Sequence, residues 1–410
     1  MNKKSEILPN NICFITHQLE HLHNVSVSIS FKAGSLYESK YNNGISHLVE
    51  HLFFRQLSDL SQESLYFNMQ KIGGEITGKT YCDYVTFSIN VIPQYLYDAL
   101  DIMLKFFDDF EWSNSIILKE KEVVLRQIEN KAYSYNQWID SIYFDNTKYT
   151  LPIMGTKKTV KSLTAFEINS WKKEYFSPAN SCVTITGNFS NEFYDFLKQK
   201  LSIINNFGKK QDPIIEIAPN FTKRNSDNYL TVINADSKLS EVVVLFDIKN
   251  SFDYESVKLI TSILSDGCGS KLSMIMREKY QLTDDIFTQL TSYCGFHRYS
   301  ISYTVKNKNI FNSIYILFKI INEIKTDITL NEYASTIPFF TDNQMIDLDN
   351  CQKLNEDYVL SDFILDILPS DPIEKAKKYK KILINDLIKI ANEIFVKENM
   401  TISKPFKSHE

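Results

Sequence analysis

One stretch of this sequence carries both a structural and a chemical signal: Gly44-Ile45-Ser46-His47-Leu48-Val49-Glu50-His51-Leu52-Phe53-Phe54. Its apolar residues recur at helical spacing, which predicts a helix over residues 44–57. At about 100° per residue, His47 and His51 are offset by about 40°, and Glu50 lies within about 100° of both. One face of the predicted helix therefore presents two imidazoles and a carboxylate.

These three side chains are the components of a hydrolytic zinc site. Two imidazoles one turn apart can bind one zinc ion, and a nearby carboxylate can accept a proton from water whose pKa zinc lowers to about 7. A chance His-x-x-Glu-His pattern is expected in roughly one in a hundred chains of this length and composition. A second histidine cluster, His17, His21 and His23, has no acidic partner at helical spacing. It falls in a segment predicted as strand and turn, so we expect surface histidines there.

The sequence around the motif alternates between strand and helix patterns. Residues 25–31 alternate apolar and polar side chains, which predicts a half-buried strand. Further strands are predicted at 12–16, 85–91 and 182–186, and further helices at 58–72, 94–109 and 113–140. The order recurs later in the chain, with strands at 230–233, 242–246 and 286–305, helices at 254–264 and through Arg277, and long helices to the end.

This recurrence predicts an internal duplication. Residues 206–228 are polar and contain Pro213 and Pro219, which is typical of an interdomain linker. We therefore expect an N-terminal domain at 1–212 and a homologous C-terminal domain at 225–410. The predicted fold class is α+β, with an antiparallel-rich sheet packed against helices in each domain.

Composition limits the classes of partner. The 410 residues carry a formal net charge of −5, and the basic residues are scattered, which argues against binding to nucleic acid. No uncharged apolar run reaches the length of a membrane span, and no signal peptide is recognisable. The six cysteines lie far apart without a Cys-x-x-Cys pair, as is typical of free thiols in a reducing compartment. We therefore expect a cytoplasmic protein.

With its surroundings, the motif resembles the inverted zinc motif of the pitrilysin and insulinase family, which includes the mitochondrial processing peptidases. Other matches to the family are Gly34-Ser35-Leu36-Tyr37-Glu38, Gly73-Gly74-Glu75, Met154-Gly155-Thr156, Tyr175-Phe176-Ser177-Pro178-Ala179-Asn180, Gly269-Ser270-Lys271-Leu272 and Met276-Arg277-Glu278-Lys279. The resemblance covers nearly the whole chain. It implies a half-clamshell of two homologous domains that, with a second such unit, encloses a chamber where unfolded peptides are cut at zinc. In members of this length the second unit is a separate chain, so the resemblance implies a homodimer or heterodimer.

The resemblance also implies roles for individual residues. Zn²⁺ is the implied cofactor, with His47 and His51 as ligands and Glu50 as the general base. An extended peptide substrate would add by backbone pairing to the strand that follows the glycine pair. The residues implied in substrate binding are Gly74, Glu75, Ile76 and Thr77.

The chain departs from the family at the third zinc ligand. The family places a glutamate there, within a downstream helix, whereas this sequence has Gln127. A neutral amide oxygen is a weak zinc donor because it supplies no charge. Glu120, seven residues earlier on the same helical face, is the alternative third ligand. Glu129 is rotated by about 200° from Gln127 and is a poorer candidate.

A second departure lies in the C-terminal half. Active members carry an arginine and, seven residues later, a tyrosine, which hold the substrate and stabilise the oxyanion. Arg277 matches the arginine, but Asp284 occupies the tyrosine position and has the wrong charge. Arg277 is therefore either a catalytic group or a solvated helix residue, and a homologous partner chain could supply the intact pair.

The sequence is compatible with two functions. The first is a zinc-dependent endopeptidase subunit that hydrolyses short unstructured peptides. The second is a non-catalytic member of the family that binds peptides or acts as a scaffold in a protease complex. A metal-binding protein without proteolysis fits less well, because open zinc sites of this kind serve hydrolysis.

Overall fold

The computed structural model describes residues 3–130, 144, 148–205, 207–212, 238–249, 251–267, 269–293, 296–365, 371–396 and 400–402. The chain divides into two compact units, Met1–Ile214 with Asp347–Ser370 and Ile215–Ile346 with Asp371–Glu410. Each unit combines a largely antiparallel sheet with helices, so the predicted α+β class is confirmed. The expected C-terminal domain at 225–410 is wrong in one respect, because residues 347–370 belong to the first unit. The expected linker at 206–228 lies mostly outside the described residues.

The first unit is built on a six-stranded sheet. Its order is β1 (Lys3–Ile7), β2 (Cys13–Gln18), β8 (Ser181–Gly187), β3 (Val25–Phe31), β7 (Val85–Val91) and β6 (Glu75–Thr80). Strands β2 and β8 pair in parallel, and the other neighbouring strands pair antiparallel. β6 lies at one edge of this sheet, where β7 is its partner among the described strands. A separate short pair, β4 (Gln56–Leu57) and β5 (Leu60–Ser61), follows the motif helix.

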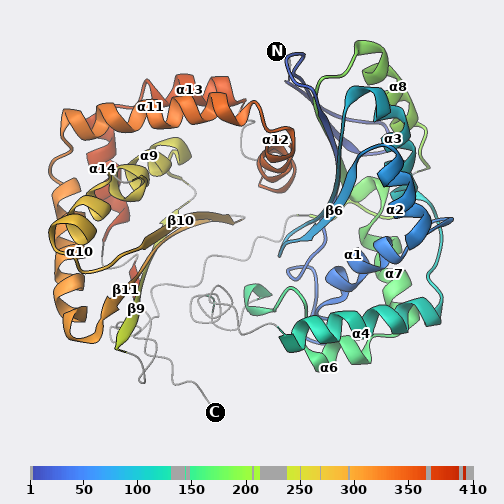
Figure 1. The fold of residues 1–410 in the computed structure, drawn as a ribbon, viewed down its shortest axis with the longest axis horizontal. Helices are drawn as coiled ribbons and strands as arrows, with labels where there is room; N and C mark the ends of the chain where they lie inside the picture. Colours follow the sequence, from blue (N-terminus) through green and yellow to red (C-terminus); the bar gives the residue numbers. More distant parts are fainter. Residues whose placement is uncertain are drawn as a thin grey trace. The chain divides into compact units, whose positions relative to one another are not determined.

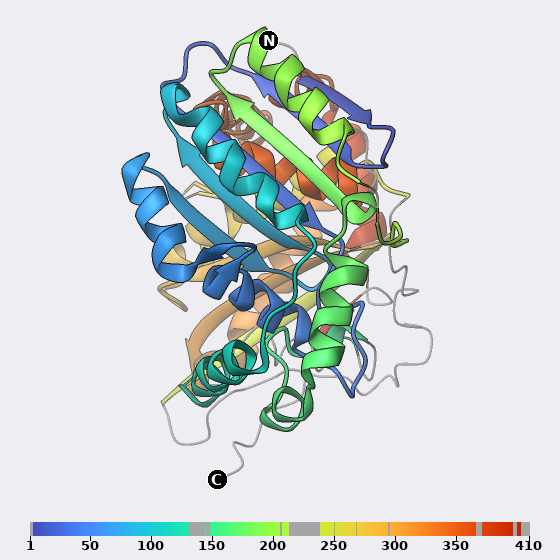
Figure 2. The same cartoon turned by 90° about the vertical axis from the view of Figure 1, so that its right-hand side faces the viewer.

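Helices of the N-terminal part of the chain cover one face of this sheet (Figures 1 and 2). The helices on this face include α1 (Ile45–Arg55), α2 (Gln62–Lys71), α3 (Leu96–Leu104), α7 (Ala165–Tyr175) and α8 (Asn191–Ser202). Helix α4 (Asn114–Asn130) packs on α1, and α6 (Lys157–Ser162) packs on α4. The predicted helices at 44–57, 58–72 and 94–109 are found with shorter bounds. The helix predicted at 113–140 is described only as far as residue 130. A single core of buried apolar side chains joins these helices to the sheet.

The other face of the sheet is covered by α12 (Cys351–Tyr358), which comes from much later in the chain (Figure 1). Asn355 on α12 is fully buried and donates to Ser26 O at 3.0 Å and to Ser28 Oγ at 3.1 Å. Its Oδ1 accepts from Thr186 Oγ1 at 2.7 Å. The serines of β3, predicted to face solvent, are therefore buried, and these contacts explain why 347–370 belongs to the first unit.

The second unit contains a four-stranded antiparallel sheet. Its order is β10 (Ile286–Tyr293), β11 (Phe296–Lys306), β9 (Leu239–Lys249) and β12 (Met400–Ile402). The main helices are α9 (Tyr254–Ser265), α10 (Ile310–Ile324), α11 (Leu330–Asp347), α13 (Pro372–Tyr379) and α14 (Ile384–Ile394). The helix predicted through Arg277 is a π-helix at Ser273–Lys279. The strand predicted at 230–233 lies outside the described residues.

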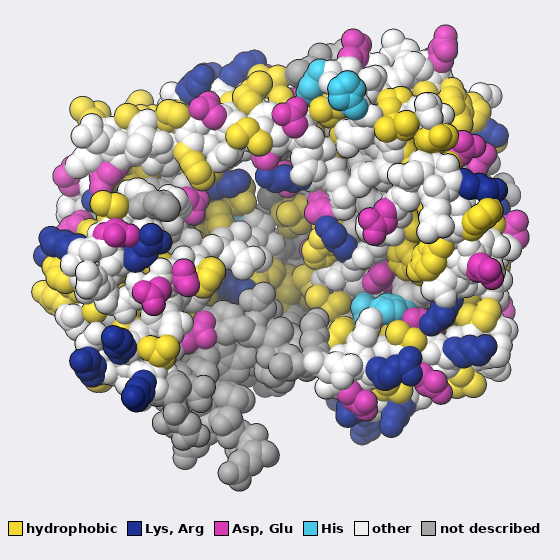
Figure 3. Space-filling view, viewed as in Figure 1, with side chains coloured by type: hydrophobic (Ala, Val, Ile, Leu, Met, Phe, Trp, Pro, Cys, Tyr) yellow, Lys and Arg dark blue, Asp and Glu magenta, His cyan; other side chains and the backbone are white. Residues whose placement is uncertain are grey.

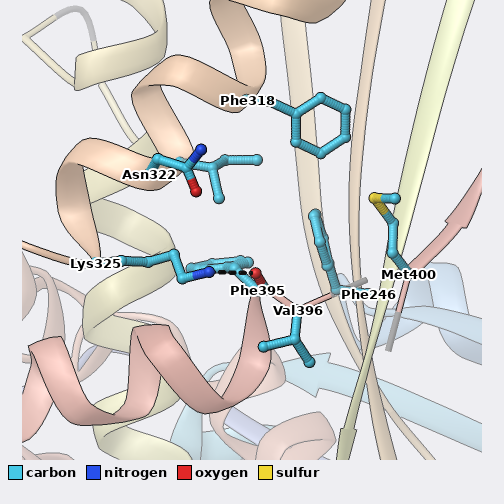
Figure 4. A pocket seen from close by; sticks show the side chains of 8 residues that line it. Phe246, Phe318, Asn322, Lys325, Phe395, Val396 and Met400 are labelled. Carbon is cyan, nitrogen blue, oxygen red and sulfur yellow. Dashed lines mark hydrogen bonds between the residues drawn. The ribbon is translucent and has the colours of Figure 1, made fainter. Parts of the chain in front are cut away.

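One apolar cavity of about 470 Å³ lies in the second unit, between α10, the end of α14 and strands β9 and β12 (Figure 4). Its lining residues are Phe246, Phe318, Ile321, Asn322, Lys325, Phe395, Val396 and Met400. Lys325 Nζ donates to the carbonyl oxygen of Phe395 at 3.0 Å, so this ammonium group caps the C-terminal end of α14. The cavity includes no residue of the motif.

Acidic and basic side chains are interspersed on the face shown in Figure 3. No helix in the described part of the chain is both long and apolar enough to cross a membrane. Four cysteines are free thiols, Cys13, Cys82, Cys182 and Cys351, and the other two, Cys268 and Cys294, lie outside the described residues.

Candidate metal centre

Helix α1 brings the three motif side chains together. Its apolar residues Ile45, Leu48, Val49, Leu52 and Phe53 are buried in the core. The opposite face carries His47, Glu50 and His51, and one possible ligand atom from each lies within 4.8 Å of the others. The two imidazole rings lie 4.6 Å apart, centroid to centroid. The one-face arrangement predicted from the spacing is therefore present.

Glu50 lies between this histidine pair and strand β6. It is 8% exposed, and its Oε2 accepts a hydrogen bond from Thr80 Oγ1 at 3.0 Å. The same oxygen lies 3.4 Å from His47 Nδ1. A Cβ atom at Gly78 would lie 2.5 Å from Glu50 Oε1 and 2.6 Å from a ring carbon of Phe54, so a side chain here would force one of these groups to shift. Residues 78 and 80 share one face of the strand, and neither was predicted to belong to the site.

The four residues implied in substrate binding lie at the start of this edge strand. Gly74 immediately precedes β6, and Glu75, Ile76 and Thr77 are its first three residues. Glu75 pairs in register with Asn90 of β7. The opposite edge of β6 has no partner strand among the described residues, as pairing with an extended peptide requires.

Glu120 on α4 contacts His51. Its Oε1 lies 2.9 Å from His51 Nδ1, and its Oε2 accepts from Arg55 Nε. The side chain is 4% exposed. Burial alone would raise the pKa of Glu120, but the hydrogen bonds from His51 and Arg55 lower it below its usual value. Both carboxylate oxygens are thus engaged by side chains of α1, which fixes the His51 ring and leaves its Nε2 available.

Gln127, two turns further along α4, contacts the other histidine. Its Oε1 lies 3.3 Å from His47 Nε2. Glu129 instead forms an ion pair with Lys157 at 3.2 Å. Packing of α4 on α1 therefore places Glu120 beside His51 and Gln127 beside His47, and it directs Glu129 elsewhere.

The donor set can be tested against the geometry of zinc. Two ligands each about 2.0–2.1 Å from a tetrahedral zinc ion lie about 3.3 Å apart. The distance of 3.3 Å between His47 Nε2 and Gln127 Oε1 matches this value and is long for a hydrogen bond. Two imidazoles and a carbonyl oxygen also leave a fourth position open, as in catalytic zinc sites. Two imidazoles with a carbonyl oxygen beside them are a donor set that fits a zinc ion.

The C-terminal residues expected near the reaction lie in the second unit. Arg277 is in the π-helix, is about half exposed, and donates from Nε to Glu278 Oε1 at 2.9 Å. This contact is the one expected of a solvated helix residue. Asp284 is exposed in the segment between this helix and β10.

The histidine cluster near the N-terminus is only partly at the surface. His17 was expected there, but it lies on β2, is fully buried, and has its Nδ1 2.7 Å from the hydroxyl oxygen of Tyr358. The prediction is wrong because α12, which carries Tyr358, covers this face of the sheet. His21 is partly exposed, 3.3 Å from an Asp349 carboxylate oxygen, and His23 is exposed.

Sequence comparisons place the chain in a known family. Residues 14–157 match the family model described as "Insulinase (Peptidase family M16)", and residues 162–337 match "Peptidase M16 inactive domain". An uncharacterized zinc protease of Rickettsia felis is 23% identical over 78% of this chain and 76% of its own length. The uncharacterized zinc protease YmxG of Bacillus subtilis is 26% identical over 45% of this chain, and the match spans less than half of YmxG, 46%.

The fold agrees with this placement. A protease from Helicobacter pylori superimposes with a TM-score of 0.82 at 18% identity, covering 99% of both chains. The zinc expected from the motif is also consistent with the names of the two bacterial relatives. The chain therefore belongs to the M16 (insulinase) family of peptidases.

Proposed function

We propose that this chain is a zinc-dependent endopeptidase subunit that hydrolyses short unstructured peptides. The observation that carries the proposal is the position of Glu50, a largely buried carboxylate next to His47 and hydrogen-bonded to strand β6. A general base must lie between the metal and the substrate, and Glu50 lies between the histidine pair and the edge strand.

Each nearby side chain has a part in this proposal. His47, His51 and Gln127 would hold the zinc ion, which when bound supplies Lewis-acid polarisation of water and of the scissile carbonyl. Glu50 accepts the proton of the attacking water and then donates it to the leaving amine. Thr80 orients the Glu50 carboxylate through its hydroxyl group. Glu120 holds the His51 ring in one orientation, as carboxylates commonly do for metal-binding histidines.

The substrate would bind as an extra strand on β6. Backbone pairing along Gly74, Glu75, Ile76 and Thr77 recognises an extended chain, which an unstructured peptide readily provides. This mode of binding gives little side-chain specificity and suits short unstructured peptides.

A second family chain would complete the chamber, as a homodimer or a heterodimer. Asp284 at the tyrosine position and the Arg277–Glu278 ion pair support a partner that supplies the arginine and tyrosine. The free thiols support a cytoplasmic site of action, since Cys13 and Cys182 are register partners on β2 and β8 and carry no disulfide.

A non-catalytic peptide-binding or scaffolding subunit is the alternative. Gln127 favours it, because a neutral donor weakens zinc binding. Asp284 also favours it, because its negative charge is wrong for stabilising the oxyanion. The two functions differ in whether Glu50 acts as a catalytic base, so a single substitution at Glu50 distinguishes them.

The test is hydrolysis of a quenched fluorescent peptide library by wild type and Glu50→Gln, alone and with candidate partner chains. We expect Glu50→Gln to lower kcat by at least about 10²-fold while zinc content stays the same, because Glu50 is a base and not a ligand. Equal turnover by both proteins would exclude this mechanism. Absence of turnover in wild type with any partner would favour the scaffolding function.

A further inference from the structure

Glu38 is a buried carboxylate next to the motif helix, and the reaction proposed above gives it no part. It is 1% exposed. Its Oε2 accepts from the backbone N–H of Gly44 at 2.7 Å and from Asn43 Nδ2 at 2.9 Å, and its Oε1 accepts from the backbone N–H of Ser46 at 2.9 Å. A buried carboxylate with three donors is held in one position.

These donors belong to the start of α1, which has no cap of its own. The N-cap residue is Gly44 with φ of 94°, its position has no side-chain cap, and the first turn contains no acidic residue. The first backbone N–H groups of a helix need acceptors, and the positive end of the helix dipole favours an anion. Glu38, which lies outside the helix, supplies both the hydrogen-bond acceptors and the anionic group. The residue that follows Ser46 is His47.

The segment that carries Glu38 also contacts the substrate-binding side of the site. The backbone N–H of Leu36 donates to Cys82 O, in the turn after β6, at 2.8 Å. The backbone N–H of Gly34 donates to Ser46 Oγ at 3.0 Å. A Cβ atom at Gly34 would lie 2.4 Å from Tyr81 O, so the two segments approach as closely as backbones can. Residues 34–38 therefore join the first turn of α1 to the end of β6.

We propose that Glu38 is a positioning residue that fixes the first turn of α1 against β6 and thereby sets the positions of His47 and Glu50. This inference rests on the proposed function, because it assigns Glu38 an effect on zinc binding and catalysis. Glu38 touches neither the metal-binding nitrogens nor the substrate strand. It acts through the backbone of Gly44 and Ser46 and through the hydrogen bonds of residues 34–38.

The experiment compares Glu38→Gln with Thr164→Ala. Glu38→Gln replaces one carboxylate oxygen by an amide NH₂ group, which cannot accept hydrogen bonds from the N–H groups around it. Thr164→Ala removes the capping box that Thr164 forms with Glu167 at the start of α7. Helix α7 contacts α1 through Trp171 and Ser46, but this variant leaves all hydrogen bonds of Glu38 intact. Each variant is measured for Tm, for the zinc Kd by competition with a chelating dye, and for hydrogen exchange of the backbone amides of residues 47–49. Glu38→Asp, which keeps the charge, is the second variant if Glu38→Gln does not fold.

We expect both variants to lower Tm, but only Glu38→Gln to raise the zinc Kd, by about 10-fold to 100-fold. Exchange of amides 47–49 should accelerate in Glu38→Gln and stay unchanged in Thr164→Ala. With an active pair of chains, kcat should fall more than KM rises, because the reacting groups are misplaced while the edge strand is intact.

Two results would overturn the inference. One is a zinc Kd within a factor of about two of wild type in Glu38→Gln despite a lowered Tm, which would mean that Glu38 stabilises the fold alone. The other is unchanged exchange of amides 47–49. If wild type itself binds no zinc, the proposed function fails, but the exchange measurement still decides whether Glu38 holds the first turn of α1.

Discussion

His51 Nδ1 lies 2.9 Å from Glu120 Oε1, and the second oxygen of the same carboxylate accepts from Arg55. A carboxylate engaged in this way by a histidine and an arginine is better suited to orient the imidazole than to bind metal itself. The choice between Glu120 and Gln127 as third donor, which the sequence leaves open, is therefore resolved in our proposal in favour of Gln127.

Removing Glu120 should weaken zinc binding without abolishing it. Glu120→Ala removes the carboxylate that holds the His51 ring, and loss of such a partner typically raises a metal Kd about 10-fold to 100-fold. Isothermal titration with zinc against a competing chelator measures the change. Glu122→Ala, an exposed glutamate on the same helix, is the control and should leave the Kd unchanged. Complete loss of zinc from Glu120→Ala would show instead that Glu120 is a ligand.

Gln127→Glu should strengthen zinc binding, because it adds an anionic donor at a position 3.3 Å from His47 Nε2. We expect the zinc Kd to fall by about 10-fold or more. Arg126→Gln changes the net charge by the same amount one residue away and should have little effect. An equal Kd for wild type and Gln127→Glu would mean that residue 127 does not bind the metal.

Gly78→Ala should lower activity while zinc stays bound. The added methyl group would lie 2.5 Å from Glu50 Oε1 and 2.6 Å from a ring carbon of Phe54, so we expect the Glu50 carboxylate to be displaced. Displacing a reacting group by about 1 Å can lower kcat about 10²-fold. Gly269→Ala is the matched control, since nothing lies within 4 Å of a Cβ atom there. Full activity of Gly78→Ala would contradict the position assigned to Glu50.

Lys172 should make stability depend on pH in the alkaline range. It is 5% exposed on α7, and its Nζ donates to Phe110 O at 2.5 Å and to Asp108 O at 3.3 Å. Burial lowers its pKa to about 8 from the usual 10.5. Above pH 8 the folded state releases a proton that the unfolded state keeps up to about pH 10.5. Because the unfolded state then binds more protons, stability rises with pH across this window.

The variant Lys172→Met lacks this titration and serves as the reference. The free energy of unfolding of wild type relative to Lys172→Met should rise by about 2 kcal/mol between pH 7.5 and pH 10. Urea denaturation at several pH values measures this difference. A difference that stays constant over the range would mean that the Lys172 ammonium group is not destabilised by burial.

Local patterns predicted much of the first unit. The apolar spacing in 44–57 predicted α1 and the common face of His47, Glu50 and His51, because both depend only on helical geometry. The alternation in 25–31 predicted β3. Its second buried face was missed, because α12 lies more than 300 residues later in the sequence. The burial of His17 against Tyr358 was missed for the same reason.

The surroundings of the site depend on contacts between elements, which no local pattern encodes. The Arg55–Glu120 contact exists because α1 packs on α4. The roles of Gly78 and Thr80 require β6 to lie beside Glu50. A glycine inside a strand does indicate a close approach, and this signal could have identified Gly78. Glu38 appeared in the sequence only as part of a matching segment, since its capping role depends on a turn that brings it back to α1.

We propose that this chain binds zinc through His47, His51 and Gln127, although the family's glutamate ligand is missing. The most direct test is the zinc content of the purified chain by elemental mass spectrometry after exchange into metal-free buffer, with His47→Ala as control. We expect close to one zinc ion per wild-type chain and a large loss of zinc in His47→Ala. Zinc close to zero in wild type, or equal zinc in both proteins, would contradict this proposal.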